Sequence, residues 1–128
     1  TWVADSEFMS RIKQICRQYG VSLVLVTHPK KTRKAGPPQI QDMAGGAAYE
    51  RFAQTILWLH HLRGYKTMPV MTDCGTTAIE FNRTIYLAKT RNGRGAGTEI
   101  AFRFDGQSLR FAEQGVIVKD QNTKETTE

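Results

Sequence analysis

Hydrophobic positions follow two different patterns near the start of the chain. Over residues 6–19 they recur at spacings of three, four and seven, which predicts an amphipathic helix. Gly20 suits the left-handed position just past the end of such a helix. Residues 21–27 are almost continuously aliphatic, which predicts a strand buried on both faces, as in the middle of a parallel sheet.

The remainder of the chain has mostly extended patterns. A short helix is predicted over 42–53, and 60–78 has no clear period, so it is interpreted as a polar connection. Asp105-Gly106 predicts a tight turn between two alternating segments. The predicted strands are 55–59, 79–82, 84–91, 98–104 and 108–111. The strands in the second half of the chain, 84–91, 98–104 and 108–111, should form an antiparallel meander at the edge of the sheet.

Together these elements predict an α/β fold with central parallel strands and a C-terminal antiparallel β-meander. The chain has 128 residues with 40% hydrophobic and 23% charged content, which is ordinary for one globular domain. We place that domain at 1–118. The polar segment 119–128 has no apolar residue and is expected to be disordered.

The charge balance points to an anionic partner. There are 18 Lys and Arg residues against 12 Asp and Glu, giving a net charge of +6 and a pI near 9.6. Nucleic acid is the leading candidate for such a chain. The densest basic stretch follows the predicted strand 21–27 and consists of His28, Lys30, Lys31, Arg33 and Lys34. It could track a nucleic-acid backbone, although a solvated run of charges has the same composition.

Two further features suit a phosphate-bearing ligand. His28 follows the predicted strand 21–27, and ligands of open α/β sheets bind beyond the carboxyl ends of the strands. Lys89 and Arg91 are two positions apart, so they project from the same face of a strand and could clamp a polyphosphate. A solvated edge strand would show the same spacing.

Several other chemistries are disfavoured by the residues. Gly93, Gly95 and Gly97 join two predicted strands, whereas a phosphate-binding glycine loop needs a helix after it. The adjacent His60 and His61 point in opposite directions if extended, so no metal site is expected. No apolar run reaches the roughly 18 residues of a membrane span. We therefore expect a cytoplasmic protein with no membrane partner.

The order of several motifs resembles the C-terminal half of the RecA-like ATPase domain of DnaB-type replicative helicases, such as the phage primase-helicases and Twinkle. The resemblance covers about residues 6–112. The segments that carry it are Thr27-His28-Pro29-Lys30-Lys31, Asp42-Met43-Ala44-Gly45-Gly46-Ala47-Ala48, Lys89-Thr90-Arg91-Asn92-Gly93 and Phe104-Asp105-Gly106-Gln107-Ser108-Leu109-Arg110-Phe111.

The resemblance implies a partial RecA-like core of the P-loop NTPase class. In that family ATP and Mg²⁺ lie between subunits of a hexameric ring that surrounds single-stranded DNA. By resemblance, His28 takes the γ-phosphate-sensing position, and Arg91 is the arginine finger, with Lys89 beside it. The implied DNA-binding residues of the central channel are Lys30, Lys31, Arg33, Lys34, Gly45 and Gly46.

The match to the family has gaps. Ala44 stands where the family usually has an arginine, and the Walker A and Walker B motifs would lie before residue 1. The fragment alone is therefore expected to be inactive and to bind neither ATP nor Mg²⁺, and it could dimerise. Two alternatives stay open: a stand-alone basic nucleic-acid-binding domain, and part of another RecA-like ATPase, of the recombinase or clock type.

Overall fold

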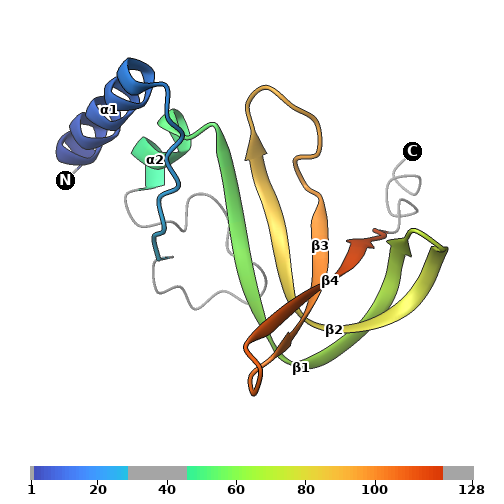
Figure 1. The fold of residues 1–128 in the computed structure, drawn as a ribbon. Coiled ribbons are helices and arrows are strands. Elements are labelled where there is room, and N and C mark those ends of the chain that lie inside the picture. Colours follow the sequence, from blue (N-terminus) through green and yellow to red (C-terminus); the bar gives the residue numbers. More distant parts are fainter. Residues whose placement is uncertain (1, 29–45, 120–128) are drawn as a thin grey trace, which may run out of the picture. The chain divides into compact units, whose positions relative to one another are not determined.

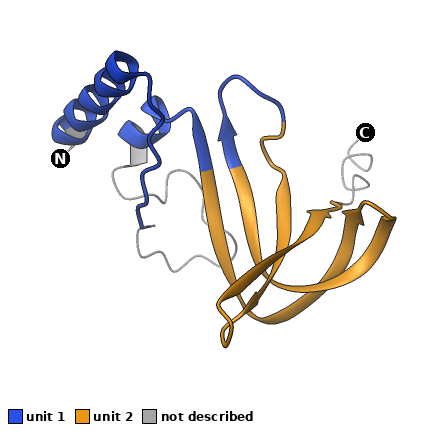
Figure 2. Cartoon of the chain, in the orientation of Figure 1, with its two compact units in different colours: residues 1–56, 88–94 blue, residues 57–87, 95–128 orange. Residues whose placement is uncertain are grey.

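The computed structural model describes residues 2–28 and 46–119 (Figure 1). Its elements are α1 (Trp2–Tyr19), α2 (Gly46–Phe52), β1 (Thr55–Thr72), β2 (Gly75–Thr90), β3 (Glu99–Asp105) and β4 (Arg110–Ile117). They belong to two compact units (Figure 2). Unit 1 is residues 1–56 with 88–94, and unit 2 is residues 57–87 with 95–128.

The first helix of unit 1 confirms the prediction from spacing. It covers all of 6–19 and begins earlier, at Trp2. Gly20 has a φ of 63°, and the backbone amide of Val21 donates to the carbonyl of Cys16 over 3.1 Å. This left-handed residue with a hydrogen bond back into the last turn is a Schellman-type C-cap. Within unit 1, α1 contacts α2.

The segment that follows this cap does not form the predicted buried strand. Residues 21–28 contain neither helix nor strand, and their aliphatic side chains face solvent, with Val24 87% and Val26 85% exposed. Within 2–28 and 46–119, every strand pairing recorded is antiparallel. The predicted α/β fold with RecA-like central parallel strands is therefore wrong. The aliphatic side chains of 21–26 stay exposed because no described strand pairs with this segment.

Most of unit 2 consists of antiparallel strands hydrogen-bonded in the closed order β1-β2-β3-β4 (Figure 1). The ring closes where Val70 and Met71 of β1 pair with Ile117 and Val116 of β4. The strand predicted over 98–104 is found as β3, shifted by one residue, while 79–82 and most of 84–91 form one continuous strand, β2, that begins at Gly75. The strand predicted over 108–111 overlaps β4 only at 110–111, and β4 continues to Ile117. The meander does not lie at the edge of a parallel sheet, however, because it closes on β1 instead.

The segment 60–78 is not a polar connection. β1 continues to Thr72, and a turn leads into β2 at Gly75, which has a φ of 105°. The hydroxyl of Thr72 stabilises this turn, because it accepts from the amide of Cys74 over 3.2 Å and donates to the carbonyl of Gly75 over 2.8 Å. Most polar side chains in this stretch occupy exposed positions of the strands. Their presence removed the clear apolar alternation from which a strand is predicted.

The core of unit 2 is small and well buried. Val70, Phe81, Ala101 and Ile117 form it, with exposures between 0% and 5%. Gly115 allows β4 to approach β1: a Cβ there would lie 2.3 Å from the carbonyl oxygen of Met71. The φ of Gly115 is 135°, which L residues rarely adopt. Only glycine therefore fits this closure without movement of the backbone.

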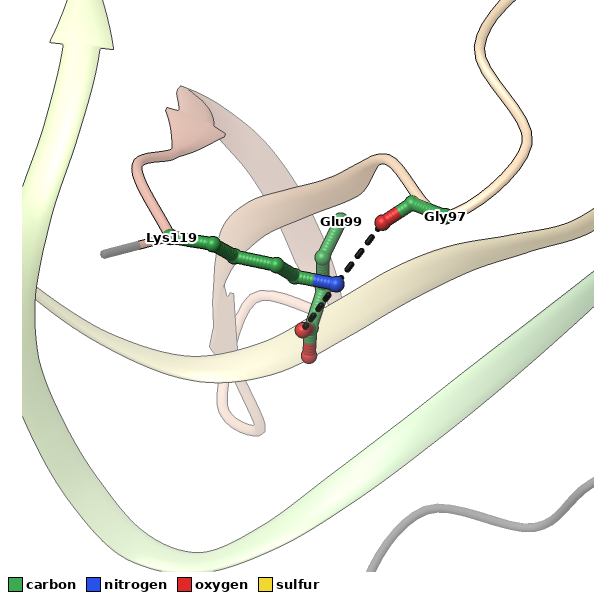
Figure 3. Close-up of polar contacts among 3 residues, drawn as sticks. All are labelled: Gly97, Glu99 and Lys119. Atoms are coloured by element: carbon green, nitrogen blue, oxygen red, sulfur yellow. Dashed lines mark hydrogen bonds and ion pairs between the residues drawn. The ribbon is translucent and has the colours of Figure 1, made fainter. Parts of the chain in front are cut away.

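The end of β4 is fastened to the turn before β3 by Lys119 (Figure 3). Its ammonium donates to the carbonyl of Gly97 over 2.7 Å and lies 3.9 Å from the carboxylate of Glu99. It also lies 5.0 Å from the ring centroid of Tyr86. Exposed ion pairs contribute little on their own, so the carbonyl and ring contacts define this attachment.

Candidate functional site

A group of cations lies at the C-terminal end of α2, within unit 1. The ammonium of Lys89 donates to the carbonyl of Glu50, and the guanidinium of Arg91 donates to the carbonyl of Arg51 over 2.6 Å. The backbone amide of Arg91 also donates to the carbonyl of Gln54 over 2.9 Å. The last carbonyls of a helix lack partners inside the helix and carry partial negative charge. Lys89 and Arg91 satisfy these carbonyls.

The two cations also act on each other. Partial burial lowers the pKa of Lys89, and the nearby positive charge of Arg91 lowers it further. The carboxylate of Glu50 raises this pKa, and the ammonium of Lys13 lowers it. An anion placed beside Lys89 would stabilise its protonated form against these neighbouring positive charges. The end of α2 is therefore a candidate anion-binding site.

The guanidinium of Arg91 keeps donors for such a ligand. Arginine carries five N–H groups in a planar fork, and the contact with Arg51 uses one nitrogen of that fork. Arg91 is exposed, while Lys89 is half-buried. Thr90 lies between them in sequence, and its hydroxyl donates to the carbonyl of Gly93 over 3.1 Å, which stabilises the start of the loop.

Of the other predicted site residues, His28 and Gly46 belong to the described part of the chain. His28 is exposed in the segment after α1. Gly46 is the first residue of α2. The remaining predicted DNA-binding residues, Lys30, Lys31, Arg33, Lys34 and Gly45, lie outside the described residues. Their DNA-binding role stays a prediction.

Unit 2 has an open hollow that the sequence did not reveal. Its volume is about 330 Å³, and its walls include His61, Tyr65, Asn82, Arg83 and Phe104. The lower end of the range for small-molecule pockets is about 300 Å³. The residues of β1 that line the hollow belong to the segment 60–78, which was interpreted as a connection. The sequence therefore did not predict that His61 and Tyr65 would lie near Phe104.

The wall of this hollow is held by specific contacts. The side chain of Asn82 bridges to the backbone of Phe104: its Nδ2 donates to the carbonyl over 3.0 Å, and its Oδ1 accepts from the amide over 2.8 Å. The guanidinium of Arg83 lies 5.0 Å from the ring centroid of Phe104. An aromatic ring next to a cation can stack on a nucleobase and attract a phosphate.

The turn beside the hollow is stabilised by a carboxylate. Asp105 accepts from the amide of Gln107 over 3.0 Å and from the hydroxyl of Ser108 over 2.9 Å. The hydrogen bond from the amide of Gln107, followed by that from the hydroxyl of Ser108, lowers the pKa of Asp105. This confirms the tight turn predicted from Asp105-Gly106.

Metal binding has no support from the side-chain arrangement. Within residues 2–28 and 46–119, no three His, Cys, Asp or Glu side chains gather where they could hold a metal ion. The binding of Mg²⁺ by the complete protein, which the helicase resemblance implies, stays a prediction, and we derive no step through it. Neither α1 nor α2 is long and apolar enough to cross a membrane.

Comparisons with protein-family models, with curated proteins and with solved structures found no match to this chain.

Proposed function

We propose that this chain is part of a ring-forming, ATP-driven DNA helicase of the DnaB type. In this proposal Lys89 and Arg91 act on the triphosphate held by a neighbouring subunit. The observation that carries the proposal is the pairing of these two cations at the end of α2, with Arg91 exposed. The proposal rests on this pair and on the motif order.

The contacts at the end of α2 suit a finger residue. A side chain that stabilises a transition state has to be positioned before the reaction, so that no free energy is lost in ordering it. The carbonyl of Arg51 holds one side of the Arg91 guanidinium, and its other N–H groups stay available to phosphoryl oxygens. Lys89 adds a second positive charge beside it.

The proposed partners follow from the same assignment. ATP would be hydrolysed between subunits, and the basic segment with Lys30, Lys31, Arg33 and Lys34 would contact single-stranded DNA in the ring. Four such contacts to single-stranded phosphates give a log–log salt slope of about −2.8 for binding. His28, exposed beside this segment, would sense the γ-phosphate.

Subunit complementation in the complete ring protein tests the proposal. Arg91→Ala should lower ATP turnover by about 10³-fold or more, as expected for an arginine finger. Mixed with subunits whose own triphosphate-binding loop is disabled, it should regain activity, because the disabled subunits still offer an intact Arg91. Arg94→Ala removes a nearby cation and should leave turnover unchanged. If mixing restores no activity although Arg91→Ala subunits enter the rings, the assignment in trans is wrong.

A second candidate function is supported by the hollow in unit 2. Its aromatic and cationic wall, with Phe104, Tyr65 and Arg83, suits the stacking of bases by a nucleic-acid-binding domain that needs no ATP. Fluorescence anisotropy with a labelled single-stranded oligonucleotide tests this. Phe104→Leu should weaken binding about tenfold or more, since stacking on one aromatic ring contributes about 1–3 kcal/mol. Leu109→Ala, at an exposed position in the next turn, is the matched control.

A further inference from the structure

The cationic end of α2 involves one more side chain, contributed by α1. The ammonium of Lys13 lies 5.7 Å from the ring centroid of Phe52, the last residue of α2. The guanidinium of Arg51 lies 6.0 Å from the same ring. Phe52 therefore has a cation from each helix beside it, next to the carbonyls that receive Lys89 and Arg91.

Lys13 is close enough to Lys89 to affect its ionisation. After partial burial and Arg91, and against the opposing effect of Glu50, the charge of Lys13 also lowers the pKa of Lys89. Lys13 is itself half-buried, so its charge is less screened by water than that of an exposed lysine. Lys13 of α1, Lys89 near the end of β2 and Arg91 just after β2 thus each contact the C-terminal end of α2.

Such a cluster fits a compact polyanion. A linear polyphosphate carries several charges on neighbouring phosphorus atoms, so three converging cations can neutralise them together. The phosphates of a nucleic-acid strand are spread along the strand, and they match cations that are spread out in the same way. The cluster at the end of α2 therefore favours a triphosphate over a DNA backbone.

We propose that Lys13 is a third phosphate-contacting residue of this site, which forms with Lys89 and Arg91 a binding site for the triphosphate chain of a nucleotide. This inference rests on the proposed function, and it names a contact that the motif Lys89-Thr90-Arg91 does not contain. Lys13 approaches from α1, so the site requires the contact between α1 and α2.

Titration calorimetry of this chain with inorganic tripolyphosphate tests the proposal. Lys13→Gln should weaken binding about tenfold, the effect of losing one hydrogen bond to a charged group. Lys13→Arg should retain most of the affinity, because it keeps the charge. Arg11→Gln removes an equal charge from an exposed position of α1 and should change binding less than about twofold. Circular dichroism checks that each variant keeps its helices.

Each other outcome overturns the inference in a different way. If Arg11→Gln weakens binding as much as Lys13→Gln, net charge alone attracts the anion. If Arg91→Ala weakens binding and Lys13→Gln does not, Lys13 lies outside the site, while the proposed function stands. If the chain binds a single-stranded oligonucleotide at the same cations and ignores tripolyphosphate, the ligand class is wrong. The complementation of subunits then decides the helicase proposal independently.

Discussion

The two units of this protein treat their apolar side chains differently. In unit 2, Val70 and Phe81 have exposures of 0% and 1% and pack in a common core. In unit 1, Val24 and Val26 have exposures of 87% and 85%. The second pair lies in the uninterrupted aliphatic run 23–26. A hydrophobic segment therefore gains free energy if it is buried, but it is buried only where another element packs against it.

One pair of matched substitutions tests whether apolar side chains are buried in unit 2 and exposed in 21–26. Phe81→Ala should lower the free energy of unfolding by about 3–5 kcal/mol, because it leaves a cavity in the core. Val24→Ala should change it by less than about 0.5 kcal/mol, since its side chain is exposed. Urea unfolding followed by far-UV circular dichroism measures both. A large loss with Val24→Ala would mean that 21–26 is buried in solution.

The closure of unit 2 at Gly115 provides a second test. Gly115→Ala should lower stability by about 3 kcal/mol, because a strained φ adds to overpacking against the backbone of Met71. Gly75→Ala is the control: Gly75 has a φ of 105° but open space around it, so it should lose only about 1–2 kcal/mol. Equal losses in the two variants would show that β1 and β4 do not approach so closely.

Thr84 offers a smaller effect, of opposite sign. It is 1% exposed, and its hydroxyl has no hydrogen-bond partner among the described residues. Thr84→Val removes a buried polar group at nearly constant volume and should raise the free energy of unfolding by about 1 kcal/mol. Thr77→Val, at an exposed position of β2, should be neutral. A loss of stability with Thr84→Val would reveal a partner for the hydroxyl.

The smallest expected effect depends on pH. Asp105 has a pKa below its ordinary value of 3.8, because the Gln107 amide and the Ser108 hydroxyl stabilise its charged form. This stabilisation is complete well above pH 3.8 and is lost as the pH falls through the lower pKa of the folded state. The difference in Tm between wild type and Asp105→Asn should therefore shrink in that acidic range. Ser108→Ala should reduce the same difference, and a difference independent of pH would contradict it.

Local signals predicted the elements whose structure is decided locally. The spacing over 6–19 gave α1, and Gly20 gave its cap, because a helix buries one stripe and ends where a left-handed residue is available. The alternation over 98–104 predicted β3, and Asp105-Gly106 predicted the turn that follows it. Neighbours in sequence determine these features.

Long-range pairing could not be predicted in the same way. The stretch from His60 to Thr72 has many polar side chains, yet it is part of β1, because pairing with β2 and β4 holds it extended. The aliphatic residues 21–27 show the reverse case, with strong strand propensity and no strand. Both errors arise because strand formation depends on partners distant in sequence.

The candidate site divides along the same line. The spacing of Lys89 and Arg91 predicted that they share one side of the chain, and both donate to neighbouring carbonyls at the end of α2. Nothing in the sequence indicated that α2 would receive them, or that Lys13 would lie nearby. The hollow lined by His61, Tyr65 and Phe104 was also missed, because its walls come from strands far apart in the chain.

The environment of Lys89 has a consequence for covalent chemistry. Partial burial and the adjacent Arg91 lower its pKa, so at a given pH more of its amine is unprotonated and nucleophilic than in an ordinary lysine. A mild acylating reagent near neutral pH should therefore label Lys89 ahead of a lysine with an ordinary pKa. A bound anion would restore the proton and slow that labelling, and the amine would report occupancy of the site without any assay of turnover.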